Sequence, residues 1–477
     1  MADNTHVVDK DIKAAEDGLE PTKSLTAGEV QHLDASAEFL YQNNITEEYL
    51  AELVNDKEKN RKLVRKIDLI VLPLLAGTYV LQYIDKQALS YAAVFDLFTS
   101  TSVTQTQYSW FASIFYLAYL VAEYPWVYLA QKTQMGKVVA GCVLSWGSVL
   151  MITAACSNFP GLAACRFFLG VFEAPITTCF MMMVSMWYVR SEQPFRAGIF
   201  YCCNGVGSML GGILSYGIGQ IDSFPVWKAV FLICGGITVL WGILLLFCLP
   251  DSILTAKRFS LARRPRAPRP HRLAQQDGPV VINGGVANFG KLIIKGLVSD
   301  PLLTTALGIP QGAFQVFWIL SGAYTATKLK NQRTTVMALW LIPTILGCVM
   351  IWKLDRAHYK VGVLFGYYLM PATNLGGYTK RITASAIVFT AYCVGNVIGP
   401  HAFLAKEAPL YPTGCKVILA CSVAQMCIAI SLRVMLMRRN KQRDEAAAAA
   451  AVTPDAQHED EGVDLTDMEN PNFRYVL

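Results

Sequence analysis

The sequence predicts an all-α, polytopic membrane protein. Only 16% of the 477 residues are charged, 53% are hydrophobic, and the mean hydropathy is +0.36. A soluble chain of this length would need far more polar surface to cover its core. Apolar runs long enough to cross about 30 Å of hydrocarbon also recur along the chain. These observations predict a bundle of membrane-spanning helices.

Two sets of six spans are predicted. Those of the first half occupy roughly 67–91, 108–130, 137–156, 160–188, 196–219 and 226–249. Those of the second half occupy roughly 280–298, 302–326, 334–352, 361–378, 382–405 and 413–436. The predicted parts are an N-terminal tail, a six-helix bundle, a basic linker, an incomplete C-terminal bundle and a C-terminal tail: 1–66, 67–249, 250–279, 280–436 and 437–477.

Basic residues mark one side of the membrane. They cluster at 57–66, in every second loop, over 257–272 and after 436, whereas the loop 92–107 is nearly free of them. The positive-inside rule therefore predicts that both termini are cytoplasmic, and we expect the protein in the plasma membrane. We expect the clusters to meet anionic headgroups of the lipid bilayer and no nucleic acid, because they adjoin apolar spans and lack interleaved aromatic residues.

Ionisable residues inside the predicted spans are the candidates for a functional site. Asp85 lies near the end of the first span, Glu123 midway along the second, and Arg166 and Glu173 in the fourth. A charged side chain at the bilayer centre costs at least ~2.5–3.5 kcal/mol, so several of them favour a shared polar pathway. Arg166 and Glu173 lie on nearly one helix face, about 10.5 Å apart along the axis, and can meet only by reaching along it or through a third group.

Structural roles are the alternative for each of these residues. Arg166 could extend to the nearer membrane interface, Glu123 could cap a helix kinked at Pro125, and Asp85 could pair with Lys86. The 13 cysteines are interpreted as small apolar packing residues. Glycines between 205 and 219 allow close helix packing, which serves a static or a rocking bundle equally well.

The motifs of common enzymes are absent from the sequence. It contains no phosphate-binding GxxxxGK[ST], no HExxH, no paired CxxC and no nucleophile elbow, and His358 and His401 belong to no recognisable ligand set. The sequence therefore predicts a transporter rather than an enzyme, without a metal or an organic cofactor.

Several motifs resemble those of a known family. The segments YIDK at 83–86, QMGK at 134–137 and CRFFLGVFEA at 165–174 resemble the major facilitator superfamily, in its anion:cation symporter branch. Further segments are similar to fungal allantoate permease-type carriers, among them SMWYVRSEQPFRAGIFY, NGGVANFGKLIIKG and RTTVMALWLIPT. The resemblance covers about 60–440. It implies uptake, driven by the proton gradient, of a small organic anion such as allantoate, ureidosuccinate, a vitamin carboxylate or a peptide-like compound; we expect a monomer.

The resemblance also implies roles for individual residues. Asp85 and Glu173 correspond to protonation sites, Arg166 to the partner of Glu173, and Lys86 to the group that contacts the substrate carboxylate. Tyr83 is expected to face the same cavity, and Glu123 joins the pathway because of its charge. The branch usually has arginine where this chain has Lys86, and a lysine cannot bind a carboxylate bidentately, so the substrate could differ.

Two apolar stretches of the family pattern are missing. A segment rich in proline and arginine stands before Asn283, and Leu369 is followed almost directly by Pro371, which shortens the seventh and tenth spans. A misplaced intron in the gene model explains both gaps; otherwise the chain is a damaged or atypical carrier. We expect Lys291 and Lys295 to lie close to lipid, at a cost of a few kcal/mol each unless they reach an interface.

Two further functions fit the same fold. One is export of a secondary metabolite, because the sequence encodes no direction. The other is a carrier-like nutrient sensor that signals through its tails. A sensor should tolerate loss of the buried charges, whereas a carrier should not.

Overall fold

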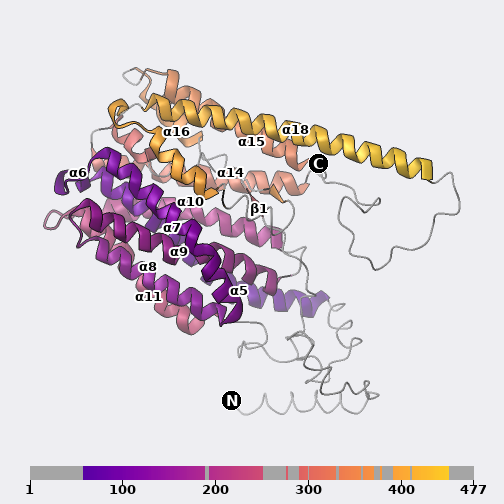
Figure 1. Ribbon diagram of the computed structural model, residues 1–477, viewed down its shortest axis with the longest axis horizontal. Helices are drawn as coiled ribbons and strands as arrows, with labels where there is room; N and C mark the ends of the chain where they lie inside the picture. The colour runs from indigo at the N-terminus through magenta and orange to yellow at the C-terminus, as the bar shows by residue number, and fades with distance from the viewer. Residues whose placement is uncertain are drawn as a thin grey trace, which may run out of the picture. The chain divides into compact units, whose positions relative to one another are not determined.

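The computed structural model describes most of the predicted spans. Its described residues are 57–188, 193–250, 276–277, 289–298, 300–328, 332–355, 358–369, 377–378, 390, 392–408 and 411–450. The chain divides into two units, 1–69 with 252–269 and 70–251 with 270–477; of the first, only 57–69 is described. Helices make up the described residues almost entirely, which confirms the all-α class (Figure 1). The predicted division into tails, bundles and linker stays a prediction.

Each predicted span of the first half coincides with one helix. The six are α5 (Lys57–Val94), α7 (Gln105–Lys132), α8 (Met135–Thr153), α9 (Phe159–Trp187), α10 (Gln193–Ile218) and α11 (Val226–Cys248), and the short α6 (Leu97–Ser100) follows α5. Polar residues begin two of them. Thr104 and Gln107 form a capping box at α7, and Asn158 Oδ1 accepts a hydrogen bond from the Gly161 amide at 3.0 Å at α9.

Most helices described in the second half are shorter than those of the first, with α18 as the exception. The helices of the second half are α13 (Pro301–Leu307), α14 (Ile309–Lys328), α15 (Arg333–Lys353), α16 (Lys360–Leu369), η3 (Gly399–Ala402), η4 (Ala405–Glu407) and α18 (Pro412–Ala450). The single span expected over 302–326 is interrupted at Gly308, because Pro310 has no N–H for the helical ladder. Residues 289–295 are also helical, and β1 (Gln276–Asp277) pairs antiparallel with β2 (Gly377–Tyr378), Gln276 opposite Tyr378.

Seven helices in the described part of the chain are long and apolar enough to cross a membrane. They are Val64–Val94, Met135–Thr153, Phe159–Val184, Val226–Cys248, Pro301–Gly322, Thr334–Lys353 and Pro412–Ala446. Helices α7 and α10 have sufficient length, with 28 and 26 residues, but contain more polar side chains. The ten described residues of α16 rise about 15 Å.

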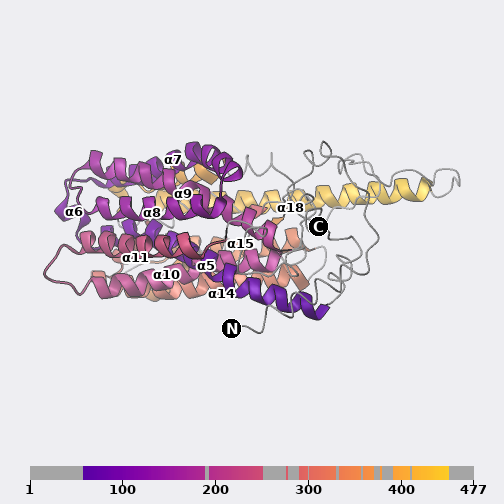
Figure 2. The same cartoon turned by 90° about the horizontal axis from the view of Figure 1, so that it is seen from below.

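Neighbouring helices pack closely through glycine. Helix α9 lies between α7 and α8, α8 also packs on α11, α10 packs on α14, and α15 packs on α16 and α18 (Figure 2). A Cβ atom at Gly170 of α9 would collide with the backbone carbonyl of Phe115 on α7, and one at Gly205 of α10 would lie 2.7 Å from the carbonyl oxygen of Gly312 on α14. Small residues are thus required where these helices touch.

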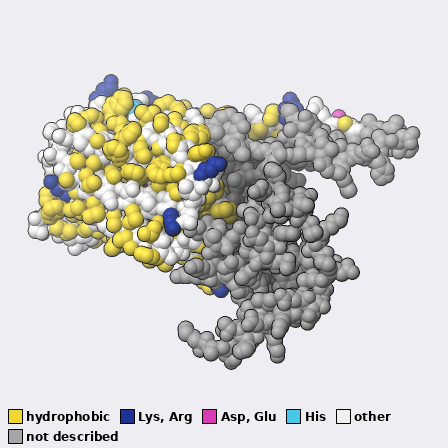
Figure 3. Space-filling model, turned by 60° about the horizontal axis from the view of Figure 1, so that its bottom comes forward, with side chains coloured by type: hydrophobic (Ala, Val, Ile, Leu, Met, Phe, Trp, Pro, Cys, Tyr) yellow, Lys and Arg dark blue, Asp and Glu magenta, His cyan; other side chains and the backbone are white. Residues whose placement is uncertain are grey.

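The outside of the bundle is apolar. Val121, Leu240 and Phe247 are 68%, 68% and 78% exposed, and hydrophobic side chains cover much of the described surface in Figure 3. A soluble monomer rarely exposes so large an apolar surface, whereas lipid chains match it. The surface thus agrees with the predicted membrane location.

Candidate substrate and proton site

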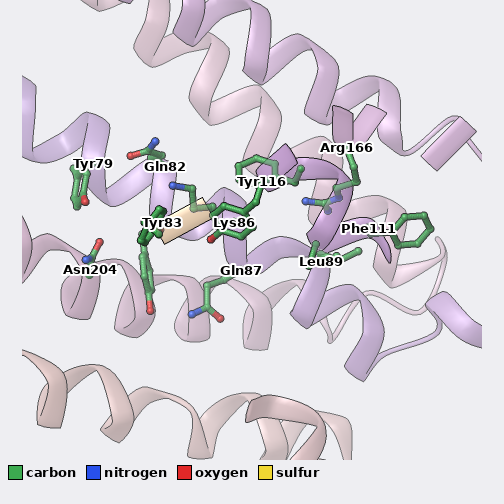
Figure 4. A pocket seen from close by; sticks show the side chains of 13 residues that line it. Tyr79, Gln82, Tyr83, Lys86, Gln87, Leu89, Phe111, Tyr116, Arg166 and Asn204 are labelled. Carbon is green, nitrogen blue, oxygen red and sulfur yellow. The ribbon is translucent and has the colours of Figure 1, made fainter. Parts of the chain in front are cut away.

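Helix α5 presents one polar face to a pocket in the bundle. Tyr79, Gln82, Tyr83 and Lys86 recur every three or four residues, which places them on one side of the helix. The other lining residues come from α5, α7, α9, α10 and the segment 392–398: Gln87, Leu89, Phe111, Ala112, Phe115, Tyr116, Arg166, Asn204 and Tyr392 (Figure 4). The empty space of the pocket is about 710 Å³, part of it open to solvent.

The first charged contact of the pocket joins α5 to α9. Lys86 Nζ lies 3.4 Å from Glu173 Oε2, and the same ammonium lies 5.4 Å from the ring centroid of Tyr119. The Lys86 side chain is 23% exposed, whereas that of Glu173 is 2% exposed. A pocket-lining cation is therefore neutralised by a carboxylate buried behind it.

The second cation of the pocket, Arg166, forms no ion pair with a carboxylate of the described residues. Its side chain is 5% exposed, its Cζ lies 5.6 Å from the ring centroid of Phe231, and its Nη2 has no hydrogen-bond partner among the described residues. This burial rules out the alternative in which Arg166 extends to the membrane interface. The pairing of Arg166 with Glu173 that the resemblance implied is not formed; Lys86 reaches Glu173 from the neighbouring helix instead.

Asp85 points away from the pocket. It is 2% exposed, and its Oδ2 accepts hydrogen bonds from Trp146 Nε1 of α8 and Thr238 Oγ1 of α11, both at 2.7 Å. Its Oδ1 has no hydrogen-bond partner in the described part of the chain. The carboxylate thus links three helices of the first half, and the alternative in which it pairs with Lys86 is wrong.

Glu123 also lies outside the pocket. It is 6% exposed, and its Oε1 accepts a hydrogen bond from the Thr178 hydroxyl, which joins α7 to α9. Its Oε2 is without a hydrogen-bond partner among the residues described. The structure therefore brings Tyr83, Lys86 and Arg166 to the pocket and Glu173 to its edge, but not Asp85 or Glu123.

Several pocket residues were missed by the sequence analysis. Gln82 and Gln87 flank the YIDK motif, and Asn204 lies in the glycine-rich α10. Amide side chains inside an apolar span were the available signal, because a buried amide requires polar partners. The aromatic residues of the pocket carried no comparable signal, since aromatic residues are common throughout the spans.

The expectation for Lys291 was wrong. We expected this residue close to lipid, but it is 2% exposed, its Nζ donates to Gln87 Oε1, and the ammonium lies 3.3 Å from the ring centroid of Tyr91. Lys295 Nζ donates to the backbone carbonyl of Val94 at 2.6 Å. Both lysines therefore direct their Nζ atoms toward hydrogen-bond acceptors on α5, inside the bundle.

Residues 75–451 match the model of the Major Facilitator Superfamily. The chain belongs to this superfamily. The match covers most of the described helices, and superfamily membership agrees with a transporter and not with an enzyme.

Related proteins align with most of the length of this chain. An uncharacterized transporter of Schizosaccharomyces pombe is 32% identical, over 95% of this chain and 94% of its own length. The allantoate permease of Saccharomyces cerevisiae is 30% identical, over 88% and 87%. The first alignment runs over 500 positions, more than the 477 residues present, so the S. pombe protein has residues without a counterpart in this chain.

Solved structures show the same fold at low sequence identity. The inward open conformation of the xylose transporter XylE from E. coli has a TM-score of 0.56 and 11% identity, with coverage of 74% of this chain and 94% of XylE. A variant of the nucleoside transporter NupG has a TM-score of 0.55 and 10% identity, with coverage of 76% and 99%. This superfamily fold is therefore shared although the sequences differ.

The two halves of this superfamily member contact each other where α5 ends and α7 begins. Ser113 Oγ of α7 donates to the Val397 carbonyl at 2.9 Å and lies 2.9 Å from His401 Nε2. Beside them, Phe289 stacks on Phe403 with ring centroids 4.8 Å apart. These contacts join the two halves at this end of the described bundle.

Proposed function

We propose that the protein is a proton-coupled importer of a small organic anion. The contact of Lys86 with Glu173 carries this proposal, because it places a titratable carboxylate against a cation of the substrate pocket. The similarity to the allantoate permease supports an organic anion as substrate. Aromatic and amide side chains in the pocket suit an anion with a flat, hydrogen-bonding body.

Arg166 and Lys86 divide the binding of the anion between them. Arg166 lines the pocket, and its guanidinium has one buried nitrogen without a hydrogen-bond partner in the described part, which is available to a carboxylate once the surrounding side chains move apart. Lys86 is occupied by Glu173 while that carboxylate is ionised. A proton on Glu173 removes the ion pair and releases the ammonium for the substrate. Proton binding and anion binding then favour each other, as linkage requires.

Loss of the proton reverses these steps. Ionised Glu173 competes with the substrate carboxylate for Lys86, so the anion leaves the pocket more readily. Affinity for the anion therefore rises at low pH, on the side where protons are abundant. This is the sign expected of a symporter.

Asp85 and Glu123 complete the proposed proton pathway. Each carboxylate has one oxygen without a hydrogen-bond partner in the described part of the chain, where a proton can reside. Neither residue lines the pocket. Their protonation would therefore change the hydrogen bonds between helices and not the contacts with the substrate.

The proposed orientation assigns the two ends of the bundle to the two sides of the membrane. With both termini cytoplasmic in the plasma membrane, the end near Ser113 and His401, where the two halves are joined, faces outward. Import is then movement from that side to the cytoplasm, and a monomer suffices for the cycle.

Reconstitution tests this function directly. The protein is placed in liposomes, an inward proton gradient is imposed, and uptake of radiolabelled allantoate and ureidosuccinate is measured with and without a protonophore. We expect accumulation of at least one anion that collapses with the protonophore. Accumulation that ignores the proton gradient, or binding without transport, contradicts the proposal and favours the exporter or the sensor, respectively.

A further inference from the structure

Lys291 is a buried cation that the proposed transport cycle does not use. It lies on the helical segment 289–295 of the second half and is among the largest fully buried side chains. Its described partners are uncharged: the Oε1 atom of Gln87 and the ring face of Tyr91. No acidic residue of the described part forms an ion pair with it. A buried ammonium without a counterion is costly, so its position requires an explanation.

The donor and acceptor inventory fixes the orientation of the neighbouring amide. An ammonium can only donate hydrogen bonds, so Gln87 must turn its oxygen toward Lys291. The NH₂ group of Gln87 then faces the other way. Gln87 lines the pocket, and the Tyr83 hydroxyl there lies within reach of the amides of Gln87 and Gln315. The amide thus presents donors on its pocket side.

We propose that Lys291 is a positioning residue for the substrate. It holds the Gln87 amide with its N–H groups toward the pocket, and in its protonated form its charge makes the wall behind Gln87 favourable for negative or carbonyl oxygen atoms. The inference rests on the proposed function and narrows the substrate class. The anion has one carboxylate for Arg166 and a second oxygen-bearing group, a carboxylate or a ureido carbonyl, for the Gln87 wall.

The placement also connects the two halves of the bundle. Gln87 belongs to α5, whereas Lys291 and Gln315 belong to the second half. A substrate held by Arg166 and by the Gln87 amide therefore contacts groups that both halves keep in place. The second oxygen group of the substrate therefore couples substrate binding to the hydrogen bond between Lys291 and Gln87, which joins the two halves.

Lys295 provides a matched control one helical turn away. Its ammonium donates to the backbone carbonyl of Val94, and the residue does not line the pocket. Lys291 and Lys295 therefore share residue type and helix but differ in the group they hold. Only Lys291 is expected to influence the substrate.

The experiment compares Lys291→Met, Lys291→Arg and Lys295→Met in liposomes. Competition by acetate, succinate and ureidosuccinate against labelled allantoate is measured, together with KM and maximal rate for allantoate. We expect Lys291→Met to raise KM and the inhibition constants of succinate and ureidosuccinate about tenfold, the size of one hydrogen bond to a charged group. The maximal rate and the weak effect of acetate should change little. Lys291→Arg should recover most of the affinity, and Lys295→Met should resemble the unmodified protein.

A measurement without ligand distinguishes loss of the positioning role from poor folding of a variant. Gln87→Glu is made alone and together with Lys291→Met, and the melting temperatures in detergent are compared. Gln87→Glu should be tolerated beside Lys291 and should destabilise the Lys291→Met protein, because the glutamate would then be buried unpaired. Equal destabilisation in both backgrounds, or unchanged inhibition constants in Lys291→Met, overturns the positioning role. If the unmodified protein binds none of the anions, the proposed function fails instead.

Discussion

The ammonium of Lys86 lies 3.4 Å from Oε2 of Glu173, although the chain places the two residues on separate helices. The resemblance to known carriers implied instead that Arg166 is the partner of Glu173. Because Lys86 holds that place, Arg166, which lines the pocket, has a buried nitrogen without a hydrogen-bond partner among the described residues and is the better ligand for an anion while Glu173 is ionised. In this arrangement Lys86 responds to the protonation of Glu173, whereas Arg166 binds the anion. Separate variants test the two roles.

Glu173→Gln should abolish proton-driven accumulation but keep exchange of substrate between the two sides of preloaded vesicles. The amide retains size and some hydrogen bonding, yet it removes the titratable group that competes for Lys86. Exchange should also lose its dependence on pH. Accumulation against a gradient by this variant would show that Glu173 is not the coupling residue.

Arg166→Lys should retain insertion and abundance but weaken the apparent substrate affinity. The charge is kept, whereas loss of the planar guanidinium removes a charged hydrogen bond of roughly 1.5–3 kcal/mol, about tenfold or more. The KM of uptake measures the change. An unaltered KM contradicts direct contact between Arg166 and the anion.

Thr238→Val should destabilise the first-half bundle by about 1–3 kcal/mol, because it removes one of the two donors to the buried Asp85 carboxylate while it keeps the side-chain shape. Thermal unfolding in detergent measures the loss. Thr238→Ser retains the hydroxyl and serves as the control. Equal melting temperatures for the valine and serine variants would argue against an energetic role of this hydrogen bond.

Gly170→Ala should destabilise the contact of α7 with α9 by about 1–3 kcal/mol, because the new methyl group would collide with a backbone carbonyl that cannot rotate away. Gly141→Ala on α8 is the matched control, since nothing lies within 4 Å of its added Cβ atom. The control should gain up to about 1 kcal/mol from helix propensity. Similar melting temperatures for both variants would show that the α7–α9 contact accommodates the added methyl group without a loss of stability.

The chain as written should transport poorly compared with a version that carries family-like segments before Asn283 and after Leu369. The sequence shortens the seventh and tenth spans, so backbone groups there require polar partners that lipid does not offer. Uptake and surface abundance in a permease-deficient host measure the difference. Equal values for the two versions would show that the shortened spans are genuine and tolerated. The transcript across codons 255–290 and 365–375 decides the gene structure independently.

The membrane fold could be predicted because hydropathy acts on whole segments. Each of the six first-half helices contains one apolar run, and α9 was recognisable by Arg166 and Glu173 within it. The break at Gly308 was missed because the apolar run continues across it. The length of α18 was also missed: the expected span ends at 436, but the alanines and charged residues that follow keep the helix intact to Ala450.

The candidate site was predictable in its members but not in its contacts. A charge inside a span is visible in the sequence, whereas the direction of its side chain depends on which helices surround it. Asp85 and Lys86 are adjacent, yet one faces α8 and α11 and the other faces the pocket, because successive residues diverge by about 100° around a helix. The burial of Lys291 depends on Gln87 and Tyr91, which lie 204 and 200 positions earlier in the chain.

The continuous helix α18 has a mechanical consequence. Its 39 residues form one rod of about 58 Å, nearly twice the hydrocarbon thickness, and its yellow end extends past α15 in Figure 1. Lys441 and Glu445, 3.7 Å apart, add an ion pair along its exposed part. Such a rod acts as a lever arm: a slight tilt of the helices that hold its base becomes a larger displacement at Ala450. A fluorophore attached near that tip would report the alternation between conformations without touching the substrate pocket.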